Sequence, residues 1–94
     1  MNKYESIIII KPAVDEEGLK ALEDKFAGLI NENGKVEEVK YMGLKKLAYE
    51  INKSREAHYV LFNFEAKPEF ITELERNYRI TDEVLKFIVV RKEN

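Results

Sequence analysis

The chain has 94 residues, 45% of them hydrophobic and 36% charged, which predicts one globular domain over residues 1–94 and excludes a disordered chain. The chain contains no cysteine, which excludes disulfides, thiol catalysis and metal sites with cysteine ligands. The net charge of −2 gives no overall sign of nucleic-acid binding, and the longest apolar run, Ile7 to Ile10, is far too short to span a membrane.

The first half of the chain predicts a strand, a helix and a second strand. Residues 3–10 form the first strand, whose four consecutive isoleucines would fill both faces, as in a central strand covered on both sides. Asp15 is expected to cap the helix that follows, and Gly34 to end it. The apolar residues between them fall on one helical stripe, which consists of Leu19, Leu22, Phe26, Leu29 and Ile30.

Residues 35–51 predict the second strand, with one irregularity. Val36 and Leu44 lie on the opposite parity from the other long apolar residues of this strand, so a bulge or bend is expected near Gly43. Residues 52–56 are polar and are expected to form a hairpin loop.

The second half repeats the pattern. Residues 57–66 predict a strand, and Lys67-Pro68 opens a helix with proline in its first turn. A turn at residues 79–83 leads to a last strand at 84–91. The residues expected to face the core are Val60, Phe62, Phe64, Phe70, Ile71, Leu74 and Tyr78.

The resulting order, β-α-β-β-α-β, predicts an α+β ferredoxin-like sandwich, in which two helices cover one face of a four-stranded antiparallel sheet. Right-handed crossovers place the first and third strands in the centre and the second and fourth at the edges.

No pattern in the chain predicts catalysis. His58 is the only histidine, without a second histidine or a cysteine to complete a metal site, and is expected at the surface or at the base of the hairpin. Nucleophile-elbow and phosphate-loop motifs are absent, and the adjacent carboxylate pairs are typical of helix ends and solvated faces. We therefore predict a protein without catalytic residues, metal or cofactor. The five phenylalanines are expected to form core rather than a base-stacking surface.

The adjacent lysines Lys45 and Lys46 lie on the predicted edge strand, which allows two interpretations. Lysine on an edge strand prevents pairing with another chain. Alternatively, a specific partner docks along this edge and contacts the same residues.

One segment resembles a known family. GLKKLAYEIN, residues 43–52, resembles the hallmark of bacterial small-ribosomal-subunit protein number six, and so do Tyr4-Glu5, Lys11-Pro12 with Asp15, and RITDEVLKFIVV at 79–90. The resemblance covers nearly the whole chain. It implies the same β-α-β-β-α-β fold and a structural role in the cytoplasmic ribosome. It also implies binding to 16S ribosomal RNA in the platform, beside the small basic ribosomal protein number eighteen.

Two sets of site residues follow from the predicted topology. Basic residues at the ends of the first and fourth strands are expected to contact RNA phosphates, and the predicted RNA-binding set is Lys3, Tyr4, Lys86 and Arg91. Base stacking by Tyr4 or Tyr59 is the alternative mechanism. The predicted partner edge consists of Lys40, Tyr41, Lys45, Lys46 and Tyr49. We expect the free protein to be monomeric.

Two other functions share this fold. A ligand-sensing or protein-interaction domain would need a glycine-containing ligand loop, and a small hydrolase would need an anion-binding loop with arginine. The loop from Lys11 to Asp15 contains neither glycine nor arginine.

Overall fold

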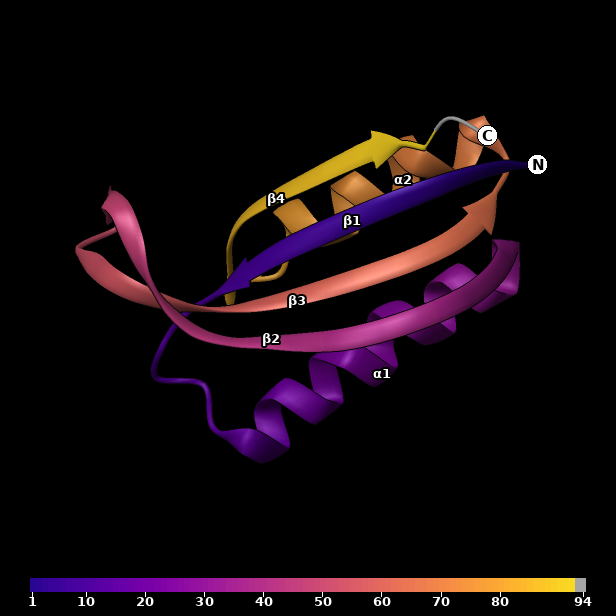
Figure 1. Cartoon of the computed structure of the whole chain (residues 1–94). Helices are drawn as coiled ribbons and strands as arrows, with labels where there is room; N and C mark the ends of the chain where they lie inside the picture. The colour runs from indigo at the N-terminus through magenta and orange to yellow at the C-terminus, as the bar shows by residue number, and fades with distance from the viewer. Residues whose placement is uncertain (93–94) are drawn as a thin grey trace.

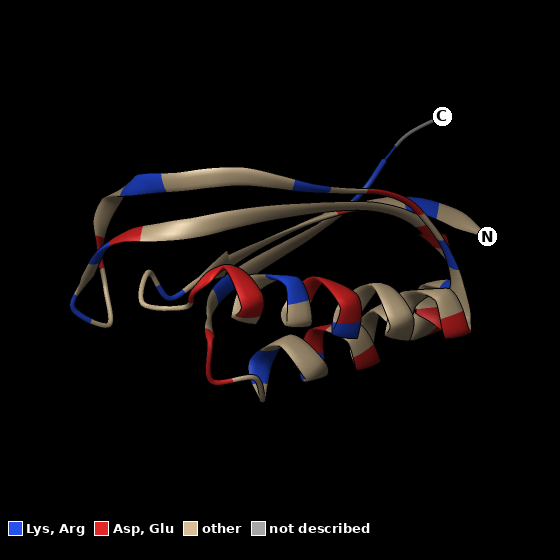
Figure 2. Ribbon diagram, turned by 90° about the horizontal axis from the view of Figure 1, so that it is seen from below, with Lys and Arg blue, Asp and Glu red and all other residues tan. Residues whose placement is uncertain are grey.

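The sheet of this protein has the predicted strand order. The computed structural model describes residues 1–92. Its elements are β1 (Asn2–Ile10), α1 (Glu16–Asn33), β2 (Gly34–Ile51), β3 (Ser54–Ala66), α2 (Pro68–Arg79) and β4 (Val84–Arg91). The strands are arranged β2-β3-β1-β4, each antiparallel to its neighbours (Figure 1). Both helices lie on the same side of the sheet (Figure 2), which confirms the ferredoxin-like sandwich.

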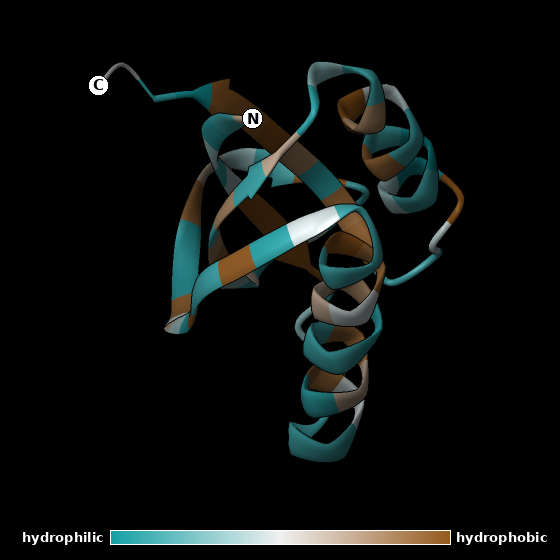
Figure 3. Cartoon of the chain, turned by 90° about the vertical axis from the view of Figure 1, so that its right-hand side faces the viewer, coloured by the Kyte–Doolittle hydropathy of each residue, from teal (hydrophilic) through white to brown (hydrophobic). Residues whose placement is uncertain are grey.

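The core lies between the helices and the even-numbered side chains of β1 and β3. Ile8 and Ile10 of β1 are fully buried there, because alternate residues of a strand face the same side. Ile9 points to the other face and is still only 6% exposed, which confirms that this end of β1 is covered on both sides. Figure 3 shows hydrophobic residues along β4, which leads to the C-terminus, and hydrophilic residues along the outer side of α1.

Both helices begin as predicted. The Asp15 side chain accepts a hydrogen bond of 2.8 Å from the backbone N–H of Gly18, which satisfies one of the free donors of the first turn of α1. Helix α2 begins with Pro68, whose missing N–H costs nothing at this position. The buried residues of the two helices are Leu19, Leu22, Phe26, Ile30, Phe70, Leu74 and Tyr78.

The two strands of the β2–β3 hairpin are longer than β1 and β4. Asn52 and Lys53 have φ of 47° and 65°, as in a two-residue hairpin turn whose twist matches that of the strands. The predicted loop over 52–56 is therefore wrong in length, since β3 already begins at Ser54. The bulge near Gly43 is confirmed by a shift in register between Tyr41 and Gly43 and by a φ of 103° at Gly43.

One buried polar pair joins β1 to α2. The hydroxyl of Tyr78 lies 2.9 Å from the Oγ atom of Ser6, and both side chains are fully buried. Burial raises the pKa of Tyr78 far above its ordinary value of 10.0, and the hydrogen bond between Tyr78 and Ser6 offsets this rise only in part.

We expect this pair to make stability fall at alkaline pH. Above the unfolded-state pKa of Tyr78, the unfolded chain loses the phenolic proton while the folded chain keeps it, so the free energy of unfolding decreases by at most about 1.4 kcal/mol per pH unit. Tyr78→Phe should remove this contribution and should also cost about 1–3 kcal/mol near neutral pH, because Ser6 loses its partner. Urea unfolding of both proteins at about pH 9 and about pH 11 measures the difference. Identical pH dependence in the two proteins would contradict the assignment.

Candidate nucleic-acid and partner interface

The four residues predicted to bind RNA do not lie together. Tyr4 pairs with Arg91, and the N–H of Lys92 donates to the carbonyl of Lys3, so three of the four lie at one end of the sheet. Lys86 pairs with Ile9 near the opposite end of β1. The structure therefore separates Lys86 from the rest of the predicted set.

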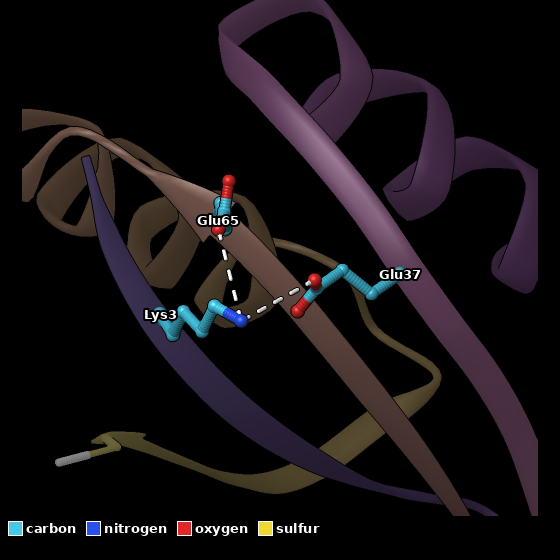
Figure 4. A network of polar contacts seen from close by, with 3 residues as sticks. All are labelled: Lys3, Glu37 and Glu65. Carbon is cyan, nitrogen blue, oxygen red and sulfur yellow. Dashed lines mark ion pairs between the residues drawn. The ribbon is translucent and has the colours of Figure 1, made fainter. Parts of the chain in front are cut away.

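Lys3 lies between two carboxylates on the open face of the sheet. Its ammonium group is 3.8 Å from Glu37 and 4.0 Å from Glu65, which belong to β2 and β3 (Figure 4). The next residue pair on this face, Glu5 with Asn63, adds a further carboxylate. Two nearby negative charges offset most of the attraction of one ammonium group for a phosphate.

Tyr4 lies in the core. It is only 7% exposed, and its ring stacks on Phe64 with the centroids 5.6 Å apart. A base cannot reach a ring face that is covered in this way, so we do not retain Tyr4 among the proposed RNA contacts. Tyr59, the other stacking candidate, is partly buried, with the ammonium group of Lys45 5.6 Å from its ring centroid.

Lys86 contacts the far end of the hairpin. Its ammonium group donates a hydrogen bond of 2.8 Å to the hydroxyl of Tyr49 and lies 5.5 Å from the centroid of the same ring. This hydrogen bond is the main reason that the pKa of Lys86 is raised above its ordinary value. A residue predicted to bind RNA thus contacts a residue predicted to bind the partner. In Figure 1 the end of the hairpin lies beyond the other strands and curls toward the first residues of β4.

The predicted partner edge forms one continuous exposed strand. Lys40, Lys45, Lys46 and Tyr49 are exposed, and within residues 1–92 no strand pairs with the outer side of β2. Tyr41 is 45% exposed, and its hydroxyl is bonded to the Nδ1 atom of His58 at 2.8 Å. The N–H of Val36 donates to the side chain of Asn31 at 2.9 Å, and the backbone groups of β2 from Lys40 to Lys46 have no strand on their outer side.

His58 is a buried residue next to the base of the arm, so of its two expected positions the one at the surface is wrong. It is 8% exposed, and its Nε2 atom lies 3.2 Å from the carbonyl oxygen of Pro12 and 3.1 Å from that of Val14. These contacts assign the N–H to Nε2 and make Nδ1 the acceptor for Tyr41. The parity that His58 shares with Val60 could have predicted its burial. The ring joins the loop before α1 to the edge strand.

A groove of about 810 Å³ lies between the end of the hairpin and Pro12. We call residues 45–56 the arm, and three of its four cations, Lys46, Lys53 and Arg55, line this groove together with Tyr49, Glu50 and Glu56. Among residues 1–92 the ion pairs are Lys3 with Glu37 and Glu65, and Lys20 with Asp24. The cations of the arm are therefore not neutralised by direct ion pairs.

Other kinds of site find no support in the described part of the chain. Residues 1–92 contain no group of three or more histidines and carboxylates placed to hold a metal ion. In the same range, neither helix is long and apolar enough to cross a membrane.

Comparison with known proteins supports the predicted resemblance. Residues 3–91 match the family model of ribosomal protein S6. The chain is 49% identical to small ribosomal subunit protein bS6 of Clostridium perfringens and 51% identical to that of Clostridium novyi, with 99% of both chains covered in each case. The crystal structure of 30S ribosomal protein S6 from Thermotoga maritima superimposes with a TM-score of 0.91 at 36% identity, over 97% of this chain and 87% of that one. The chain belongs to the ribosomal protein S6 family.

Proposed function

We propose that this protein binds 16S ribosomal RNA in the platform of the small subunit, together with ribosomal protein number eighteen. Membership of the S6 family makes it a structural protein of the small ribosomal subunit, in the cytoplasm, and not an enzyme. The observation that carries the proposal is the match of residues 3–91 to this family, at about half identity to relatives of the same length.

The charge distribution supports a cooperative mode of binding. The chain has 16 basic and 18 acidic side chains, and Lys3 is already paired with two carboxylates. Counterion release by clustered cations provides most of the non-specific affinity for RNA, so the protein alone should bind weakly. A basic partner docked on the outer side of β2, near Lys40 and Tyr41, would add the missing cations and present one composite surface.

Filter binding to a platform fragment of 16S ribosomal RNA, with and without ribosomal protein number eighteen, tests the proposal. We expect the partner to increase the affinity of this protein for the RNA by roughly 5- to 150-fold, the usual range of coupling between two sites. The control is an unrelated RNA of the same length, measured at the same ionic strength. Equal affinity with and without the partner would contradict cooperation, and absence of binding in both cases would contradict the proposed function itself.

A further inference from the structure

The arm contains cations that are free to bind an anion. Lys46, Lys53 and Arg55 line one groove without an ion pair, whereas Lys3 at the opposite end of the sheet is held between Glu37 and Glu65. A phosphate that approaches the arm does not have to displace a carboxylate from direct contact with these cations. The arm is therefore better suited to phosphate than the predicted site at Lys3.

The same groove presents an aromatic ring at the surface. Tyr49 is 62% exposed, and the hydrogen bond of 2.8 Å from Lys86 holds its hydroxyl. The ammonium group of Lys86 lies 5.5 Å from the centroid of this ring, and Tyr49 is otherwise largely exposed, so an unpaired base can stack on the ring face that Lys86 leaves free. Such stacking tolerates any base. Tyr4, in contrast, is covered by Phe64.

Two carboxylates of the groove favour a nucleotide over a bare phosphate polymer. Glu50 and Glu56 line the groove with the three cations, and they repel phosphate oxygens. The amino groups on base edges, however, can donate hydrogen bonds to carboxylates. A mixture of cations, carboxylates and one exposed ring matches the donors, charges and flat surface of a nucleotide.

We propose that the arm groove binds an unpaired nucleotide of RNA, with the base stacked on Tyr49 and the adjoining phosphates bound by Lys46, Lys53 and Arg55. This inference rests on the proposed RNA-binding function and locates it at the arm. It assigns Lys46 and Tyr49 to the RNA and leaves Lys40 and Tyr41 to the partner edge.

The test uses fluorescence anisotropy of a labelled cytidine octamer, whose bases carry an amino group, with the full chain at several salt concentrations. Tyr49→Ala should weaken binding by roughly 5- to 150-fold, while Tyr49→Phe, which keeps the ring, should retain most of the affinity. The plot of log affinity against log salt has a negative slope. The double variant Lys53→Gln/Arg55→Gln should make this slope less steep by about 1.4, or ~0.7 for each phosphate contact. The matched control is Lys35→Gln/Lys67→Gln, which removes two exposed cations near the end of the β2–β3 ladder opposite the arm and should leave the slope unchanged.

Three results would overturn the inference. One is equal binding by the arm double variant and its control. Another is unchanged affinity of Tyr49→Ala combined with equally good competition by inorganic polyphosphate, which would show attraction to phosphate alone. The third is an arm variant that loses binding to a basic partner protein but binds the octamer as well as the wild-type protein does, which would make the arm a protein-docking site.

If the wild-type protein binds the platform RNA fragment and the arm variants bind it equally well, only this inference fails. If the wild-type protein does not bind that fragment even with the partner, the proposed function fails.

Discussion

Replacing Gly34 with alanine is expected to lower the free energy of unfolding by about 2–3 kcal/mol, as overpacking does in a well-packed site. A Cβ atom at Gly34 would overlap the carbonyl oxygen of Glu65 and lie 3.0 Å from the Cα atom of Ala66, its partner across the β2–β3 ladder. The φ of Gly34 is 179°, which alanine adopts without strain, so the cost comes from contact with the neighbouring backbone. Chemical denaturation of the two proteins measures the difference.

Gly28 provides the matched control, with the opposite sign. It lies in α1, and a Cβ atom there would have no neighbour within 4 Å. Gly28→Ala should therefore raise the free energy of unfolding by about 0.5–1 kcal/mol, because alanine loses less conformational entropy in a helix. If both variants changed stability in the same direction, the packing argument for Gly34 would be wrong.

Replacing both Lys45 and Lys46 with valine should leave the fold intact and cause self-association. The outer side of β2 carries backbone groups that no strand within residues 1–92 pairs with. Without the two charges, the stretch from Leu44 to Ala48 becomes an apolar edge that can pair with a second copy. We propose that the same two charges keep the free wild-type protein monomeric.

Light scattering at increasing protein concentration measures this effect. The control is Lys11→Val/Lys67→Val, which makes the same change of charge and hydrophobicity at exposed positions outside the strands. We expect the control to keep the mass of a monomer while the edge variant grows with concentration. A double edge variant that stays monomeric would show that something other than these lysines protects the edge.

Most of the fold could be predicted because it depends on local patterns. The helical stripe from Leu19 to Ile30, the cap at Asp15 and the proline at the start of α2 are encoded in neighbouring residues, and the structure contains all three. The hairpin turn was the exception, because the polar residues after Lys53 looked like loop although they continue the ladder of β3. In an edge hairpin, polar residues are compatible with strand structure, so polarity did not mark its limit.

The site was predicted less well because its contacts join distant segments. The resemblance of residues 43–52 identified the family, and spacing placed Lys45 and Lys46 on an edge strand. Only the register of β1 with β3 places Lys3 beside Glu65, and only the bend of the hairpin brings Tyr49 to Lys86 across 37 positions of sequence. The sequence by itself determined which residues lie on which element and face, since hydrophobic periodicity is local. The tertiary structure decided which charges are neutralised and which rings remain exposed, because register and hairpin curvature depend on the packing of the whole sheet.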